Sequence, residues 1–144
     1  MFAEEIRQSP PFATVLGMEY VREQGSKLWV RLRVSEHILQ DTQARRVHGG
    51  AITATLDNAR GWCIRTHSQY ENGTSMATLD LRVDFIRPAV PELDIMVMAE
   101  CYAIQKNMAY AKAVAYQTSM NDPIAKSLAT FAGYTERNQD DRVS

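Results

Sequence analysis

VHGGAITATLDNARGWCI, residues 47–64, is the stretch around which the chain is organised and the one that points to a specific chemistry. Its length and its many apolar residues predict one helix, with Gly49 and Gly50 at its start, directly after His48. Glycines allow a ligand to approach the backbone closely, and the first N–H groups of a helix lack intrahelical partners. The sequence therefore predicts an oxyanion site at the start of this helix.

A single carboxylate, Asp57, follows about two turns later in this charge-poor helix. It could form a structural ion pair with Arg60 at i+3, which stabilises a helix only weakly when it is exposed. Alternatively, Asp57 is a functional acid, because most side chains on its face of the helix are small and would let a ligand or another chain approach. Both roles stay open.

His48 also has two possible roles. A histidine at a helix entry can bond to nearby backbone and be purely structural. The positive end of the helix dipole also favours the neutral imidazole, which can donate a hydrogen bond to a ligand. The position of His48 directly before two glycines keeps the functional role in view.

The composition indicates one domain, residues 1–144 with a core at about 12–135, because a chain of 144 residues with 45% hydrophobic residues can bury a substantial core. The net charge of −1 argues against a broad basic surface for nucleic acid. No apolar run approaches membrane-spanning length, and the first residues lack the apolar stretch of a signal peptide. We therefore expect a cytoplasmic protein that binds neither nucleic acid nor membrane.

The cysteine and histidine content indicates no redox or metal site. Cys63 and Cys101 lack CxxC spacing and fall inside predicted elements, so we expect reduced, buried thiols. No set of ligands with metal spacing exists among His37, His48, His67 and the cysteines, so no metal is assigned. No cofactor is implied.

Alternating apolar and polar residues predict strands in most of the remaining chain. The polar residues 35–46 lack a period and are expected to form a loop. In the strongest strand signal, 76–85, one face is expected to carry the apolar residues, which alternate with polar ones: Leu79, Leu81, Val83 and Phe85 against Thr78, Asp80, Arg82 and Asp84. Further strands are expected at 18–23, 27–34, 94–104, 109–119 and 124–134.

One face of the last three strands is rich in small residues, which would form a shallow trough. Because packing requires matching volumes, the helix could lie closely in this trough. The sequence thus predicts an α+β fold with one helix against a largely antiparallel sheet. The small residues are Ala99, Cys101, Ala103, Ala109, Ala111, Ala113, Ala115, Ala125, Ser127 and Ala129.

These features together resemble the hotdog-fold acyl-CoA thioesterases, specifically the phenylacetate-pathway (PaaI-like) branch of the 4-hydroxybenzoyl-CoA thioesterase superfamily. The resemblance covers about residues 12–134 and rests on His48-Gly49-Gly50, on Asp57, and on a strand that closes in FIRPA at 85–89. It implies a long central helix wrapped by a curved antiparallel sheet. It also implies a homo-oligomer, a dimer or a dimer of dimers (homotetramer), with active sites at the subunit interface.

The resemblance further implies roles for individual residues. Asp57 would be the general base or nucleophile, contributed by one subunit. The amide of Gly49, with His48 and Gly50 beside it, would polarise the thioester carbonyl from the other subunit. Ser75 would help to orient the attacking water.

Two positions depart from the family pattern. Thr42 replaces an asparagine that is frequent six residues before the histidine, and Arg45 replaces a glycine that is common three residues before it. Thr42 keeps a hydroxyl donor for substrate binding, although its side chain is shorter. Arg45, Arg46 and Arg87 are candidates for the phosphates of the carrier, with ordinary surface cations as the alternative.

Three functions follow as hypotheses. The first is hydrolysis of an acyl-CoA or aryl-CoA thioester, with Asp57 as base or nucleophile. The second is binding of an acyl-CoA or related ligand without turnover, motivated by the departures at Thr42 and Arg45. The third, a hotdog hydratase or dehydratase, is weaker because that branch places its histidine and acid differently.

Overall fold

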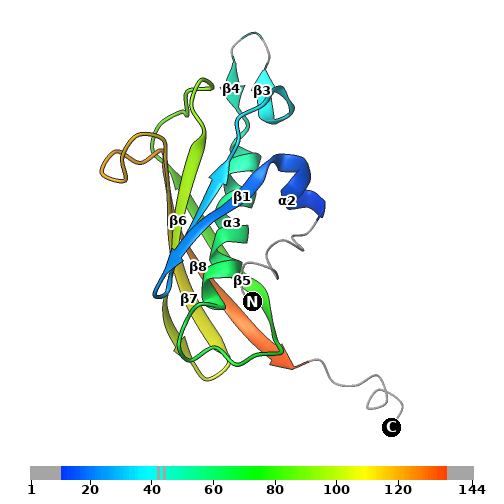
Figure 1. The fold of residues 1–144 in the computed structure, drawn as a ribbon, viewed down its shortest axis with the longest axis vertical. Coiled ribbons are helices and arrows are strands. Elements are labelled where there is room, and N and C mark those ends of the chain that lie inside the picture. Colours follow the sequence, from blue (N-terminus) through cyan, green and yellow to red (C-terminus); the bar gives the residue numbers. More distant parts are fainter. Residues whose placement is uncertain (1–10, 42, 44, 136–144) are drawn as a thin grey trace.

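The fold is built on one long helix that lies along one face of an antiparallel sheet (Figure 1). The computed structural model describes residues 11–41, 43 and 45–135. Within them, α3 (Gly49–Ile64) packs on a six-stranded sheet of order β1-β2-β6-β7-β8-β5. This arrangement confirms the predicted α+β class and the hotdog architecture. The other main elements are α2 (Pro11–Leu16), β1 (Met18–Gln24), β2 (Lys27–Leu32), β5 (Thr74–Phe85), β6 (Ile95–Gln105), β7 (Met108–Tyr116) and β8 (Ala125–Thr135).

The predicted trough of small residues is where α3 lies. Ala99 on β6, Ala111 on β7 and Ala125 on β8 are fully buried, and α3 contacts all three strands. Side chains this short let the helix approach the sheet, while Leu56 and Cys63, fully buried on α3, fill the space between the two layers. The small side chains of the sheet and the larger ones of α3 therefore pack together and fix the position of the helix on the sheet.

A β-bulge in β5 changes the face that two residues occupy. The register of β5 with β8 shifts between Thr78 and Asp80. An extra residue in one strand of a pair interrupts the alternation of faces at that point. Leu79 is consequently 60% exposed, and the prediction that it shares one face with Leu81 is wrong. Thr78 turns toward α3 instead.

A second bulge, in β6, removes Ala103 from the predicted trough. The register of β6 with β7 shifts between Cys101 and Ala103, so that Ala103 pairs with Tyr110. Ala103 therefore leaves the inner face, where the alternating pattern had placed it. Ile104 packs against the core instead.

The stretch 35–46 is more ordered than the predicted loop. It contains a 3-10 turn, η1 (Glu36–Ile38), and a small two-stranded sheet of β3 (Leu39–Asp41) and β4 (Arg46–Val47). Ile38 is buried, and its carbonyl accepts the His48 N–H at 2.7 Å. Elements this short leave no detectable period in the sequence, which explains why the loop prediction was wrong.

Strand β5 forms one edge of the sheet, at the side opposite β1. It is long and largely exposed, and it ends in Phe85, which is 54% exposed. An exposed, apolar edge strand offers unpaired backbone groups to another chain. No helix in the described part of the chain is long and apolar enough to cross a membrane.

We predict that Ala111→Leu lowers the free energy of unfolding by about 1–3 kcal/mol, because the larger side chain would push α3 off the sheet. Urea denaturation measures this change. Ala132→Leu is the matched control, since Ala132 is half-buried and lies on the outer face of β8. Equal losses in the two variants would contradict tight helix packing in the trough.

Candidate active site

His48 closes the start of α3 as its N-cap residue. Its ring Nδ1 accepts a hydrogen bond from the Gly50 N–H at 2.8 Å. A neutral imidazole that accepts through Nδ1 carries its proton on Nε2, which remains a donor. The structural role left open for His48 is therefore present, and it leaves one ring donor for a ligand.

The two glycines after His48 occupy different situations. The N–H of Gly50 is engaged by the His48 ring, and a Cβ on Gly50 would lie only 2.8 Å from Nδ1. A side chain at this position would therefore disturb the cap. Gly49 is the first residue of α3, and no described residue accepts a hydrogen bond from its N–H. Gly49 is thus the backbone donor that this helix start offers to an oxyanion.

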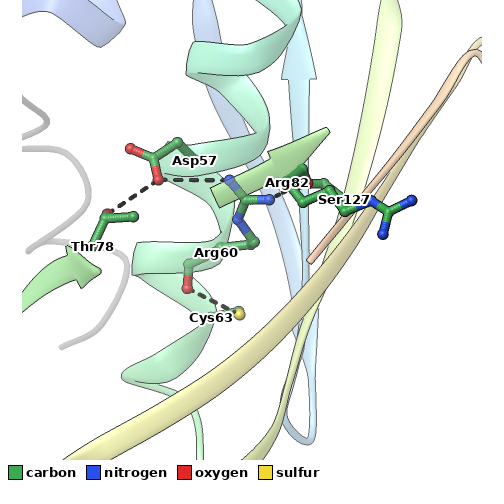
Figure 2. Close-up of polar contacts among 6 residues, drawn as sticks. All are labelled: Asp57, Arg60, Cys63, Thr78, Arg82 and Ser127. Atoms are coloured by element: carbon green, nitrogen blue, oxygen red, sulfur yellow. Dashed lines mark hydrogen bonds and ion pairs between the residues drawn. The ribbon is translucent and has the colours of Figure 1, made fainter. Parts of the chain in front are cut away.

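Asp57 lies in the middle of α3 with its side chain 42% exposed. Its carboxylate Oδ1 is 3.6 Å from Nη2 of Arg60 and accepts a hydrogen bond from the Thr78 hydroxyl at 3.3 Å. Figure 2 shows the Asp57 and Thr78 side chains pointing toward each other between α3 and β5. The ion pair that the sequence left open is therefore present, and the carboxylate still reaches solvent.

Arg60, the ion-pair partner of Asp57, is fully buried. Its Nη1 donates to the Ser127 hydroxyl on β8, and Ser127 donates to the Arg82 carbonyl on β5 at 2.7 Å (Figure 2). Burial lowers the pKa of the Arg60 guanidinium, and the nearby Asp57 carboxylate opposes this shift. Because arginine titrates far above neutral pH, the group stays charged. The buried Arg60 cation therefore lies next to the half-exposed Asp57 carboxylate, on its interior side.

Thr78 and Ser127 are site residues that the sequence did not indicate. Thr78 faces Asp57 because of the bulge in β5, which an alternating pattern does not signal. Ser127 is the one hydroxyl among the alanines of the trough, and a buried hydroxyl requires a polar partner, which is the signal that could have found it. Ser75 lies three residues before Thr78, on the opposite face of β5 by backbone alternation.

Gly49 and Asp57 are too far apart in one chain to act on the same carbonyl group. About 12 Å of helix separates them, at about 1.5 Å per residue. A reacting atom must come within about 3 Å of both groups. Two cavities of about 380 Å³, one beside the α3–β5 connection and one on the outer face of the sheet, contain neither residue. The described part of one chain therefore places the Gly49 N–H and the Asp57 carboxylate at two separate positions along α3.

The predicted carrier-binding residues have different surroundings. Thr42 lies outside the described residues. Arg45 has a φ of 52°, and its Nε is 4.0 Å from a carboxylate oxygen of Glu92. Arg87 donates from Nη2 to the Asp122 carbonyl at 2.8 Å and lies 3.2 Å from the carboxylate of the same residue. Arg87 thus ties the end of β5 to the β7–β8 turn, whereas Arg45 stays exposed.

The cysteines are free and buried, as the sequence predicted. Burial raises the pKa of Cys101 to about 11 and raises that of Cys63 well above its usual value. Both thiols are therefore protonated near neutral pH and poor nucleophiles. Within the described residues, no three His, Cys, Asp or Glu side chains gather into a group that could hold a metal ion.

Comparison with known proteins places this geometry in a family. The family model described as the thioesterase superfamily matches residues 45–123. A solved structure of a protein from Pseudomonas aeruginosa is 31% identical, covers 91% of this chain and 96% of its own, and has a TM-score of 0.76. No curated protein sequence gives a match.

Two further solved structures share the fold at lower identity. A thioesterase from Haemophilus influenzae is 17% identical, with 95% of this chain and 93% of that one covered and a TM-score of 0.82. The PaaI protein of Escherichia coli, from the phenylacetic acid degradation operon, is 16% identical, with coverages of 92% and 90% and a TM-score of 0.77. The chain therefore belongs to the thioesterase superfamily of hotdog-fold proteins, a membership that supports thioester hydrolysis as its class of reaction.

Proposed function

We propose that the protein hydrolyses an acyl-CoA thioester to a free acid and CoA, at sites formed between two subunits. The observation that carries this proposal is the half-exposed Asp57 carboxylate, which is held through one oxygen beside β5. It lies on the same helix as the Gly49 N–H, for which no described residue is an acceptor. Each chain thus offers a base and an oxyanion donor, too far apart to serve one substrate.

The edge strand β5 provides a way to bring the two halves together. Thr78 of β5 lies beside Asp57. Phe85, at the end of β5, lies beside the helix start, and its Cζ would be 3.4 Å from a Cβ on Gly49. If two β5 strands pair antiparallel around residues 81 and 82, Thr78 of one strand comes opposite Phe85 of the other. Asp57 of one subunit then lies beside Gly49 of the partner subunit.

The proposed reaction uses both halves of the site. In one route, Asp57 takes a proton from water as the water attacks the thioester carbon; the carbon–sulfur bond then breaks, and the same proton passes to the sulfur so that CoA leaves as the thiol. In the other route, Asp57 itself attacks the carbon and displaces CoA as the thiolate, which takes up a proton from water, and a water molecule then hydrolyses the resulting mixed anhydride to the free acid. Gly49 of the partner subunit stabilises the negative charge on the carbonyl oxygen, with His48 of the partner subunit beside it. Thr78 orients Asp57, whereas Ser75, on the opposite face of β5, is not placed to contact this water within one chain.

The carrier and the assembly form the remaining part of the proposal. We assign the phosphates of CoA to Arg45 and Arg46, which are exposed before the helix start. Arg87 is a weaker candidate because Asp122 already engages it. Gly50 supports the site by allowing the cap at the helix start to close. Two subunits complete the sites, a homotetramer would pair two such dimers, and reduced thiols fit a cytoplasmic protein.

Binding without turnover is the second candidate function. The departures from the family pattern at Thr42 and Arg45 favour it. Release of free thiol from the wild-type protein separates the two functions.

We predict that Asp57→Asn lowers turnover by about 100-fold or more, because an amide cannot accept the proton of the attacking water. The measurement is free thiol released from a panel of short, medium, long and aryl acyl-CoAs. Affinity for the substrate, measured by calorimetry, should change little because asparagine has the same shape. Turnover at the wild-type rate in this variant would remove Asp57 from the mechanism.

We predict that Gly49→Pro lowers turnover by about 100-fold or more through loss of one N–H donor. Proline is well tolerated at the first position of a helix. The residue before it already has a compatible extended conformation, with φ −65° and ψ 126° at His48. Gly49→Ala is the matched control, since it keeps the N–H and should retain most of the activity. Equal losses in both variants would show that bulk matters here rather than the hydrogen bond.

A further inference from the structure

We propose that Arg60 is a positioning residue for Asp57, which fixes the carboxylate through Oδ1 and leaves Oδ2 as the oxygen that acts on the substrate. This inference rests on the proposed hydrolysis. Arg60 itself is fully buried and so does not reach the substrate. It deepens the proposed function by saying which oxygen of Asp57 reacts and what holds it in place.

The contacts of Asp57 distinguish its two oxygens. The guanidinium of Arg60 and the hydroxyl of Thr78 both approach Oδ1, at 3.6 Å and 3.3 Å. No described residue donates a hydrogen bond to Oδ2. Because Arg60 lies on α3 and Thr78 on β5, the carboxylate is held from two sides (Figure 2). The side chain as a whole is 42% exposed, so a carboxylate anchored through Oδ1 remains open to a ligand.

The guanidinium of Arg60 is itself held in place by Ser127 on β8. Its Nη1 donates to the Ser127 hydroxyl, which donates to the Arg82 carbonyl. This chain of contacts runs from α3 through β8 to β5. The guanidinium therefore cannot move away from Asp57 without breaking a buried hydrogen bond, and it acts as a rigid support for the carboxylate.

Arg60 is costly as a purely structural residue. Its Nε and Nη2 have no hydrogen-bond acceptor among the described residues, although both atoms are buried. Burying a cation with unsatisfied donors is unfavourable, and removing Arg60 would leave no buried unpaired charge because its partner Asp57 is half-exposed. A buried cation with unsatisfied donors that contacts the Asp57 carboxylate is best explained by its effect on that carboxylate.

The test is Arg60→Met, with kcat, affinity and stability measured together. We expect kcat to fall on the order of tenfold to hundredfold, because a loosely held carboxylate is misplaced. Affinity for a thioether analogue of the acyl-CoA, which cannot be hydrolysed, should stay within about twofold. The midpoint of thermal unfolding should stay equal or rise. A structural role would give the opposite pattern, a lower midpoint with kcat retained, and would overturn the inference.

Two further variants keep the test decisive. Arg33→Met removes an exposed guanidinium that pairs with Glu19 at 2.8 Å, at the other side of the sheet, and should leave kcat unchanged. Arg60→Lys carries the test if Arg60→Met does not fold, because an ammonium keeps the charge but cannot reach both Ser127 and Asp57. A fall in kcat of about fivefold or more with unchanged analogue affinity supports positioning, and wild-type kcat overturns it.

The outcomes also separate this inference from the proposed function. If Asp57→Asn is inactive while Arg60→Met turns over at the wild-type rate, only the role of Arg60 fails. If Asp57→Asn keeps full activity, the proposed mechanism fails and the positioning role with it. If the wild-type protein releases no thiol, the proposed hydrolysis fails, and the positioning role, which rests on it, fails with it.

Discussion

The rigid length of α3 is the constraint on which the account of this protein depends. The helix carries at its start an N–H for which no described residue is an acceptor, and a carboxylate two turns later; its backbone hydrogen bonds keep the two groups about 12 Å apart. No rotation of side chains can close that distance. In the proposed reaction a second chain therefore supplies one half of each site, and the edge strand β5, which lies near the helix at both groups, is the element proposed to align the two chains.

The sheet fixes where the two halves lie. Alanines such as Ala111 let α3 pack closely, so the helix has little freedom to slide or tilt. The same close packing buries Arg60 beneath Asp57, where its guanidinium pairs with Ser127 and Asp57. Function and stability oppose each other at this point, since the buried cation is unfavourable for the fold and favourable for a fixed carboxylate.

Much of the fold was predictable because its strands and helix leave periodic patterns of residue type in the sequence. The small residues on alternate positions of the late strands indicated the trough, and VHGG indicated a helix start. The contact of Thr78 with Asp57 could not be predicted, since it depends on a bulge that breaks the alternation. The burial of Arg60 could not be predicted either, because a helical wheel places it beside Asp57 but does not say which strand covers it.

The most direct test of a site shared between subunits is complementation of two inactive chains. Asp57→Asn and Gly49→Pro chains, co-expressed with different tags, should form mixed dimers in which one of the two sites has both residues intact. With random pairing, turnover should recover to about a quarter of the wild-type value in the unfractionated mixture and to about half in dimers purified through both tags. Failure to recover above the level of the separate variants, in dimers purified through both tags, would contradict the shared site.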